Sequence, residues 1–208
     1  MKVSICAGLL LLAVTLQVWA EEPPVQSAMC MSCHGEKGQG NALLGAPRLA
    51  GQQADYLLTQ LLNFKTGVRG YDPRDPYGAQ MRAVTAVLGE DEIERLSSYY
   101  ANQEVQSPER VELKHSAEGE KIYQGTCAYC HGPKGEGFAH LKTPRLSILD
   151  GAYMERQLEN YLQGIRGGED HADELGIWMR GIALQIADES ERKAVIDYIT
   201  SLSVANAR

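Results

Sequence analysis

Apolar residues recur at helical spacing in several parts of the chain. Between residues 54 and 65, Leu57, Leu61 and Phe64 follow one another at intervals of four and three positions, so they share one face of a helix. The same pattern returns over residues 153–163. The spacing therefore predicts two copies of one amphipathic helix.

Three other segments also have helical patterning. Residues 90–101 place Ile93 and Leu96 on one face and begin with acidic residues, which favour a helix N-terminus. Residues 189–202 are the counterpart of this segment, and residues 116–126 predict one more helix. No stretch sustains the alternation of apolar and polar residues that is typical of a strand. The pattern therefore predicts an all-α fold.

The two halves of the chain are related by a duplication. A shift of 97 positions places many residues of the first half on identical or similar residues of the second. The aligned pairs include Pro47 with Pro144, Tyr56 with Tyr153, Gln60 with Gln157, Phe64 with Tyr161 and Arg69 with Arg166. A solenoid repeat is much shorter, roughly 20–50 residues, so the duplication indicates two tandem domains. We place them at residues 21–106 and 107–208, joined by a polar connector around Pro108.

Composition and charge narrow the class of protein. The 208 residues are 44% hydrophobic and 23% charged, which is ordinary for a globular protein. The net charge of −7 argues against nucleic-acid binding, which needs a basic surface. An acidic surface is instead suited to protein partners that present basic docking patches.

The first twenty residues have the features of a secretory signal peptide. Lys2 precedes an apolar run over residues 5–16, and Val18 and Ala20 provide small residues before a cleavage site after Ala20. The alternative is an uncleaved anchor, but the run is short for a membrane span of about twenty residues. Cys6 lies inside the run and would leave with the signal. These features predict export to the periplasm.

The four remaining cysteines form two identical motifs. Each motif is C-x-x-C-H, the attachment pattern of c-type haem. The motifs are Cys30-Met31-Ser32-Cys33-His34 and Cys127-Ala128-Tyr129-Cys130-His131. Thiols three positions apart can add to the two vinyl groups on one edge of a porphyrin, and the adjacent histidine then reaches the iron. The spacing predicts two covalently attached haem c groups.

Three other uses of paired cysteines compete with haem attachment. Exported proteins form disulfides, a C-x-x-C pair can be a thioredoxin-like redox site, and two such pairs can bind zinc. A histidine directly after both pairs, with no other cysteine in the mature chain, favours haem.

Each iron needs a second axial ligand downstream of its histidine. Met81 lies 47 positions after His34, and Met179 lies 48 positions after His131. Both are followed by arginine and fall in a predicted loop before the last helix of a domain. A single methionine is usually core filler, but matched positions in a duplication favour ligation. We therefore predict His34 and Met81 on one iron, and His131 and Met179 on the other.

Other methionines and histidines fit these roles less well. Met154 corresponds to Leu57 of the first half and is predicted to be a core residue. Met29 and Met31 are too close to the attachment site to reach the far face of the haem. His171 lies in an acidic, glycine-rich loop and is kept as an alternative ligand of the second haem.

Further repeated residues suit the surroundings of a haem. The carbonyls of Pro47 and Pro144 are candidates to accept the N–H of the iron-binding histidines, which would fix the imidazole rings. Guanidinium groups match the carboxylates of haem propionates, although solvated arginines are the ordinary alternative. The candidates are Arg48, Arg145, Arg69 and Arg166. Tyr56 and Tyr153 are expected either to line the pockets or only to pack beside them.

The sequence resembles the dihaem cytochrome c4 family over nearly all of the mature chain. The first unit is carried by CMSCHGEKGQG, PRLAGQQADYLLTQLLNFKTGVRG and MRAVTAVLGEDEIERLSSYYA, and the second by CAYCHGPKGEGF, TPRLSILDGAYMERQLENYLQGIRGG and MRGIALQIADESERKAVIDYI. The resemblance implies two class I cytochrome c domains related by pseudo-twofold symmetry. It also implies His/Met ligation, haems that face each other across the interface, and periplasmic electron transfer.

The chain departs from the family pattern before the first motif, after the second PRL motif, and in the loops Gly70–Ala79 and Gly168–Leu175. Only nine mature residues precede Cys30, so the opening helix of the first domain is shortened. The second domain has SILDG after its PRL motif, where the first has AGQ.

These features predict an electron carrier without a catalytic site or small-molecule substrate. Its partners would be redox proteins, among them a membrane-bound oxidase or dehydrogenase. One alternative is a dedicated electron-transfer subunit of a sulfur-compound or alcohol oxidising enzyme, which an exposed apolar patch near one haem edge would favour. A haem peroxidase is the other alternative, but it needs an open axial position, and the matched methionines argue against one.

Overall fold

The structure is a computed structural model that describes residues 22–104, 116–168 and 171–205. The predicted signal peptide, its cleavage site and the predicted boundary between residues 106 and 107 lie outside these ranges. Within them the chain forms helices and a single isolated β-bridge between Asn41 and Ala46, and it contains no strand. The all-α prediction is confirmed. None of the helices in these ranges has the length and apolar character needed to cross a membrane.

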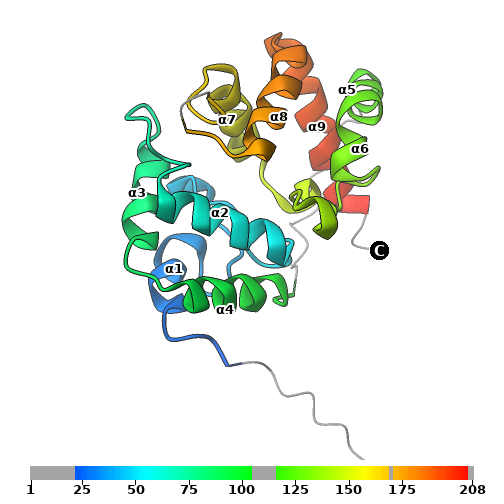
Figure 1. Cartoon of the computed structure of the whole chain (residues 1–208). Helices are drawn as coiled ribbons and strands as arrows, with labels where there is room; N and C mark the ends of the chain where they lie inside the picture. The colour runs from blue at the N-terminus through cyan, green and yellow to red at the C-terminus, as the bar shows by residue number, and fades with distance from the viewer. Residues whose placement is uncertain (1–21, 105–115, 169–170, 206–208) are drawn as a thin grey trace, which may run out of the picture.

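The helices form two groups that lie side by side (Figure 1). The first group contains α1 Ser27–His34, α2 Ala54–Thr66, α3 Pro76–Thr85 and α4 Glu90–Ala101. The second contains α5 Ala117–Ile122, α6 Ala128–His131, α7 Gly151–Leu162, α8 Glu174–Ala183 and α9 Glu189–Ala205. A π-helical turn, Tyr123–Cys127, joins α5 to α6, and short 3₁₀ turns cover Ala42–Leu44, Ala139–Leu141, Leu146–Ile148 and Leu184–Ile186. The helices expected from the apolar pattern are therefore present.

One structural prediction is wrong. Met81 and Met179 do not lie in loops, because each belongs to a ten-residue helix, α3 or α8. The physical reason is a helix cap that the apolar pattern does not reveal. Asp75 accepts a hydrogen bond from the Gly78 N–H ahead of α3, and Asp173 does the same for Gly176 ahead of α8.

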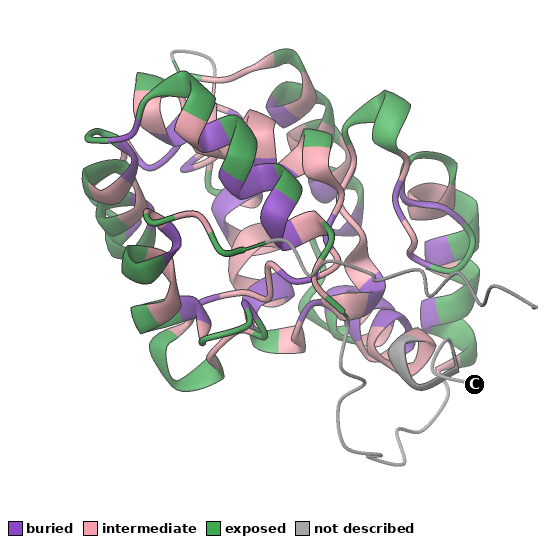
Figure 2. Cartoon of the chain, turned by 90° about the horizontal axis from the view of Figure 1, so that it is seen from below, coloured by how far each residue is buried: buried purple, intermediate pink, exposed green. Residues whose placement is uncertain are grey.

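Each group of helices has its own apolar core. Figure 2 shows how buried and exposed residues alternate along the helices. The first core contains Leu57, Leu88, Ile93, Leu96, Tyr99 and Tyr100. The second contains Tyr123, Leu149, Tyr153, Met154, Ile186, Val195, Ile196, Tyr198 and Ile199. Met154 is thus a core residue, as its correspondence to Leu57 predicts.

The two domains differ at their N-terminal ends. In the second, α5 crosses α9 so closely that a Cβ on Gly119 would lie 1.9 Å from the Ala194 carbonyl oxygen. The first domain opens directly with α1, whose start is held by a hydrogen bond from Gln26 to Glu92. The Tyr100 hydroxyl also donates to the Ser27 carbonyl at 3.5 Å. In the first domain, these two contacts take the place of the α5–α9 crossing of the second domain.

Because α5 and α9 cross closely at Gly119, we expect a side chain at that position to lower the stability of the protein. Gly119→Ala should lower the free energy of unfolding by about 1–3 kcal/mol, the usual cost of overpacking. Gly125→Ala is the matched control, because nothing lies within 4 Å of the added Cβ, so its stability should be unchanged or slightly raised. Urea unfolding of the haem-loaded proteins measures both. Equal midpoints for Gly119→Ala and the wild type would contradict the close crossing.

Candidate haem sites

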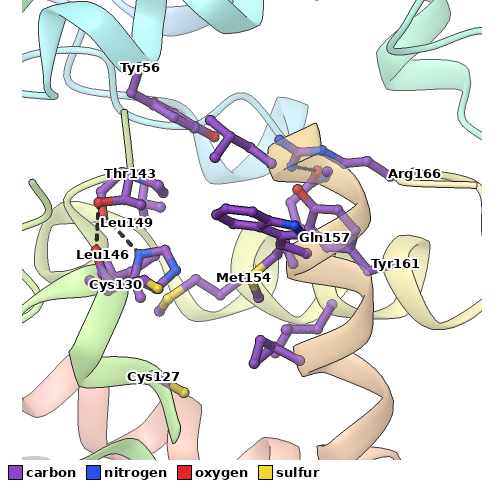
Figure 3. Close-up of a pocket in the computed structure, with 18 of the residues that line it drawn as sticks. Tyr56, Cys127, Cys130, Thr143, Leu146, Leu149, Met154, Gln157, Tyr161 and Arg166 are labelled. Atoms are coloured by element: carbon purple, nitrogen blue, oxygen red, sulfur yellow. Dashed lines mark hydrogen bonds between the residues drawn. The ribbon is translucent and has the colours of Figure 1, made fainter. Parts of the chain in front are cut away.

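Each C-x-x-C-H motif lines a cavity in its own domain. Cys30, Cys33 and His34 line a cavity of about 530 Å³, within the usual 300–1,000 Å³ range of cofactor and ligand pockets. The equivalent residues Cys127, Cys130 and His131 line a smaller cavity of about 170 Å³, shown in Figure 3.

The four cysteines belong to short helical segments, and none of their side chains is fully buried. Cys30 and Cys33 lie one turn apart on α1, which puts them on the same face. Cys127 ends the π-helical turn and Cys130 lies on α6. All four are free thiols, so no disulfide forms among them. Burial raises the pKa of Cys30, and it raises the pKa of Cys127 to about 11.

The two histidines are neutral imidazoles, which is the form that binds a metal. Both are buried, and their Nδ1 atoms lie 2.8 Å from the Pro47 carbonyl oxygen and 3.2 Å from that of Pro144. A carbonyl only accepts, so Nδ1 carries the proton and Nε2 keeps its lone pair. Burial lowers the pKa of both histidines, against the smaller opposing effect of these bonds. The predicted role of the two proline carbonyls is confirmed.

The structure brings each predicted methionine to the cavity of its own histidine. Met81 on α3 lines the first cavity, and Met179 on α8 lines the second. Met154 also lines the second cavity from α7, while it packs in the apolar core. His171 lines neither cavity. The centroid of its ring lies 4.2 Å from the centroid of the Tyr71 ring.

Arg69 and Arg166 meet in a network between the domains. Arg69 donates to Gln60 and Gln157, both at 2.8 Å, and to the Tyr153 hydroxyl at 3.2 Å. Arg166 donates to Gln157 at 2.8 Å and to Gln60 at 2.7 Å. Because the shift of 97 relates Arg69 to Arg166 and Gln60 to Gln157, the network follows the duplication. Gln60, Arg69, Gln157 and Arg166, with Tyr56 and Tyr153, are called the interdomain network below.

This network carries positive charge without a matching acid. No ion pair of the described residues includes Arg69 or Arg166. Arg69 is 8% exposed, and its Nε is buried without a hydrogen-bond partner in the described part of the chain. Burial alone raises the pKa of Tyr153, but Arg69, Arg166 and Arg156 outweigh it and lower that pKa. A buried cation is costly unless an anion accompanies it, so the site is suited to the carboxylates of haem propionates.

The other two arginine candidates have different surroundings. Arg48 lines the first cavity and donates to the Gln39 carbonyl at 3.3 Å. Arg145 lies at the domain interface, where its guanidinium donates to the Gly51 carbonyl at 3.3 Å and its backbone N–H donates to the Gln52 side chain. Arg145 does not line the second cavity.

The two cavities share a wall. Tyr56, Gln60, Leu149, Tyr153 and Gln157 line both of them. In Figure 3 Tyr56 comes from the first domain to the second cavity, and Arg166 lies beside Gln157. The role of the two glutamines is not evident from the sequence, where they are known only as a repeated pair. Groups bound in the two cavities would therefore be separated by the interdomain network.

The sequence is similar to those of known proteins. A family model described as cytochrome c matches residues 25–103 and 116–203. Cytochrome c4 of Stutzerimonas stutzeri is 44% identical over 196 residues, which cover 88% of this chain and 89% of the relative. The chain belongs to the dihaem cytochrome c4 family. It is therefore an electron-transfer cytochrome whose two domains carry covalently bound haem c.

Some relatives of this cytochrome are named after thiosulfate dehydrogenase. A thiosulfate dehydrogenase electron acceptor of Thiomonas intermedia is 32% identical and covers 88% of this chain and 82% of the relative. Among solved structures, cytochrome c4 of Acidithiobacillus ferrooxidans has a TM-score of 0.68 at 30% identity, covering 84% of this chain and 99% of that one. Thiosulfate dehydrogenase TsdBA of Marichromatium purpuratum has a TM-score of 0.62 at 27% identity, covering 83% of this chain but 36% of that one.

Proposed function

We propose that this cytochrome carries single electrons in the periplasm through two six-coordinate haems. His34 and Met81 would ligate one iron, and His131 and Met179 the other. Cys30 and Cys33 would attach the first haem, and Cys127 and Cys130 the second. The observation that carries the proposal is that each cavity brings a C-x-x-C-H motif together with a methionine from a separate helix.

Residues around each site would orient the iron ligands and exclude reactions other than electron transfer. A bound haem supplies a one-electron couple, and methionine ligation raises its reduction potential. The proline carbonyls orient the histidine rings, and each methionine closes the position that a substrate would need. Arg69 and Arg166 would supply positive charge to the carboxylates of haem propionates. Two filled axial positions suit electron exchange and not catalysis at the iron.

The shared wall supports transfer between the two haems. The residues of the shared wall border both cavities, so no third cofactor is needed between them. One molecule can then accept an electron at one domain and release it at the other. Export through the N-terminal segment of residues 1–20 would place the protein in the periplasm with its redox partners.

An anaerobic titration with carbon monoxide tests the closed iron sites. The fully reduced protein should deliver two electrons per chain to ferricyanide, and its spectrum should not change when carbon monoxide is added. It should also have no peroxidase turnover. Carbon monoxide binding to either reduced haem at neutral pH would contradict the proposal and favour the peroxidase alternative.

A surface feature favours a second candidate function, that of a dedicated electron-transfer subunit. Ile177, Trp178 and Leu184 are 51%, 61% and 49% exposed along α8 and the turn that follows it. The equivalent residues of the first domain are Ala79, Gln80 and Ala86. Trp178 also lines the second cavity, so the apolar patch borders the second haem site. Since relatives are named as thiosulfate dehydrogenase electron acceptors, we infer that such an enzyme docks here.

Replacing the tryptophan tests the docking patch. Trp178→Gln gives the second domain the residue of the first, and it should weaken the complex with a thiosulfate dehydrogenase by about tenfold or more, as for an interface hot spot. Val87→Gln is the control, because Val87 is 73% exposed but lies in the other domain. Stopped-flow electron transfer at varied cytochrome concentration measures the affinity. Equal affinities for both variants and the wild type would contradict docking at this patch.

A further inference from the structure

The residue that caps the helix carrying Met179 is hydrogen-bonded to the other domain. Asp173 precedes α8, and one of its carboxylate oxygens accepts from the Gly176 N–H at 3.0 Å. The other accepts from the side-chain amide of Asn63 on α2 at 2.9 Å. Asn63 belongs to the first domain, so a single carboxylate joins the domain interface to the first turn of α8. Met179 is the sixth residue of that helix, less than two turns from the cap.

The loop ahead of α8 is held by the first domain at two further points. The Tyr71 hydroxyl donates to the Gly164 carbonyl at 3.2 Å, and the Tyr71 ring lies 4.2 Å from the ring of His171. The approach to α8 is therefore held from the first domain by Asn63 and Tyr71 together.

Among the described residues, the bond from Asn63 to Asp173 has no mirror in the first domain. Asn160 is the equivalent of Asn63, yet its side-chain N–H₂ is buried and has no hydrogen-bond partner among the described residues. Asp75 caps α3 by accepting from the Gly78 N–H at 2.9 Å. The second domain reaches α3 by a different contact, the Arg156 guanidinium 4.4 Å above the Tyr77 ring. The duplication is thus broken at the contacts that each methionine helix receives from the opposite domain.

We propose that Asn63 is a positioning residue for the axial methionine of the second haem. Through Asp173 it fixes the first turn of α8, and so it holds Met179 toward the iron from the opposite domain. Docking of the two domains thereby controls the ligation of the second haem, while the first haem does not depend on Asn160. This inference rests on the proposed ligation by Met179.

Cyanide binding to the oxidised protein measures how firmly each methionine is held, because cyanide has to displace it. Asn63→Ala should raise the apparent cyanide affinity of the second haem by about tenfold or more, the effect expected for losing a hydrogen bond to a charged group. The first haem should be unchanged. Asn160→Ala is the matched control and should alter neither haem. If the cyanide affinity of the second haem in Asn63→Ala stays within twofold of the wild-type value, the proposal is overturned.

Exchanging the side chains at positions 63 and 173 separates the effect of their hydrogen bond from an effect on the stability of the whole protein. Asn63→Asp alone places two carboxylates together and should raise the cyanide affinity of the second haem further than Asn63→Ala. Asp173→Asn keeps a capping oxygen and presents an N–H₂ group to Asn63, whose amide can turn over to accept from it, so a neutral bond replaces the charged one and the effect should be smaller than in Asn63→Ala. Asn63→Asp combined with Asp173→Asn restores a donor and an acceptor, and the affinity should return toward the wild-type value. Failure of the combined variant to recover would overturn the proposal, even if the single variants fold poorly.

Met179→Ala distinguishes this inference from the proposed function. Loss of the ferric sulfur-to-iron absorption band of one haem in that variant assigns the second haem and supports the ligation. If the band persists, Met179 is not the ligand and both proposals are wrong. If the band is lost while the Asn63 variants bind cyanide like the wild type, the proposed function stands and the positioning role is wrong.

Discussion

Met179→Ala should lower the reduction potential of one haem by about a tenth of a volt or more, since axial ligands tune haem potentials over about 0.8 V. The thioether favours the reduced iron, and its removal leaves an open position. The variant should therefore lose half of the ferric sulfur-to-iron band and bind carbon monoxide at one haem when reduced. Met81→Ala should have the same effect on the other haem, because Met81 lines the first cavity.

Met154→Leu is the control for both variants. Met154 lines the second cavity and is 6% exposed, but its correspondence to Leu57 marks it as an apolar core residue. The substitution should leave both bands and both potentials in place, with at most a small loss of stability. Loss of a band in Met154→Leu and its survival in Met179→Ala would show that the second iron takes the other methionine.

Cys127→Ala combined with Cys130→Ala should give a protein with one covalently bound haem in place of two. The second cavity would then lose both attachment points, and the apolar residues around it would face an empty pocket. We expect the second domain to lose most of its helical order, while the first haem keeps its spectrum. Haem content per chain, measured by mass spectrometry of the unfolded protein, gives the result.

The mirror variant, Cys30→Ala combined with Cys33→Ala, completes this test. It should retain the second haem and lose the first. Two haems that remain attached in either double variant would contradict the assignment of the attachment sites.

The sequence reveals the parts of the site that depend on short-range chemistry. A C-x-x-C-H motif specifies two thiols and a histidine within one turn, so Cys30, Cys33 and His34 can be recognised without the fold. Duplication then makes Met81 and Met179 the candidate ligands, because methionine recurs at nearly matched spacing after the two histidines. Apolar periodicity likewise predicts α2, α4, α7 and α9 close to their observed bounds.

Other parts depend on contacts between distant residues. The helices that carry the methionines follow glycine-, proline- and aspartate-rich segments, and only the capping bonds of Asp75 and Asp173 show that helices begin there. The uncompensated charge of Arg69 and Arg166 becomes visible only when the two domains meet. The bond from Asn63 to Asp173 joins residues 110 positions apart, which no local pattern can reveal.

An optical redox titration of the periplasmically matured protein tests the central claim, that two His/Met haems make this cytochrome an electron carrier. The ferric sulfur-to-iron band and the spin state are followed through the whole titration. We expect two one-electron waves at positive potential, both from low-spin haems and each with the loss of part of that band. A wave at strongly negative potential, or a high-spin ferric haem, would contradict the claim, because that iron would then lack its methionine.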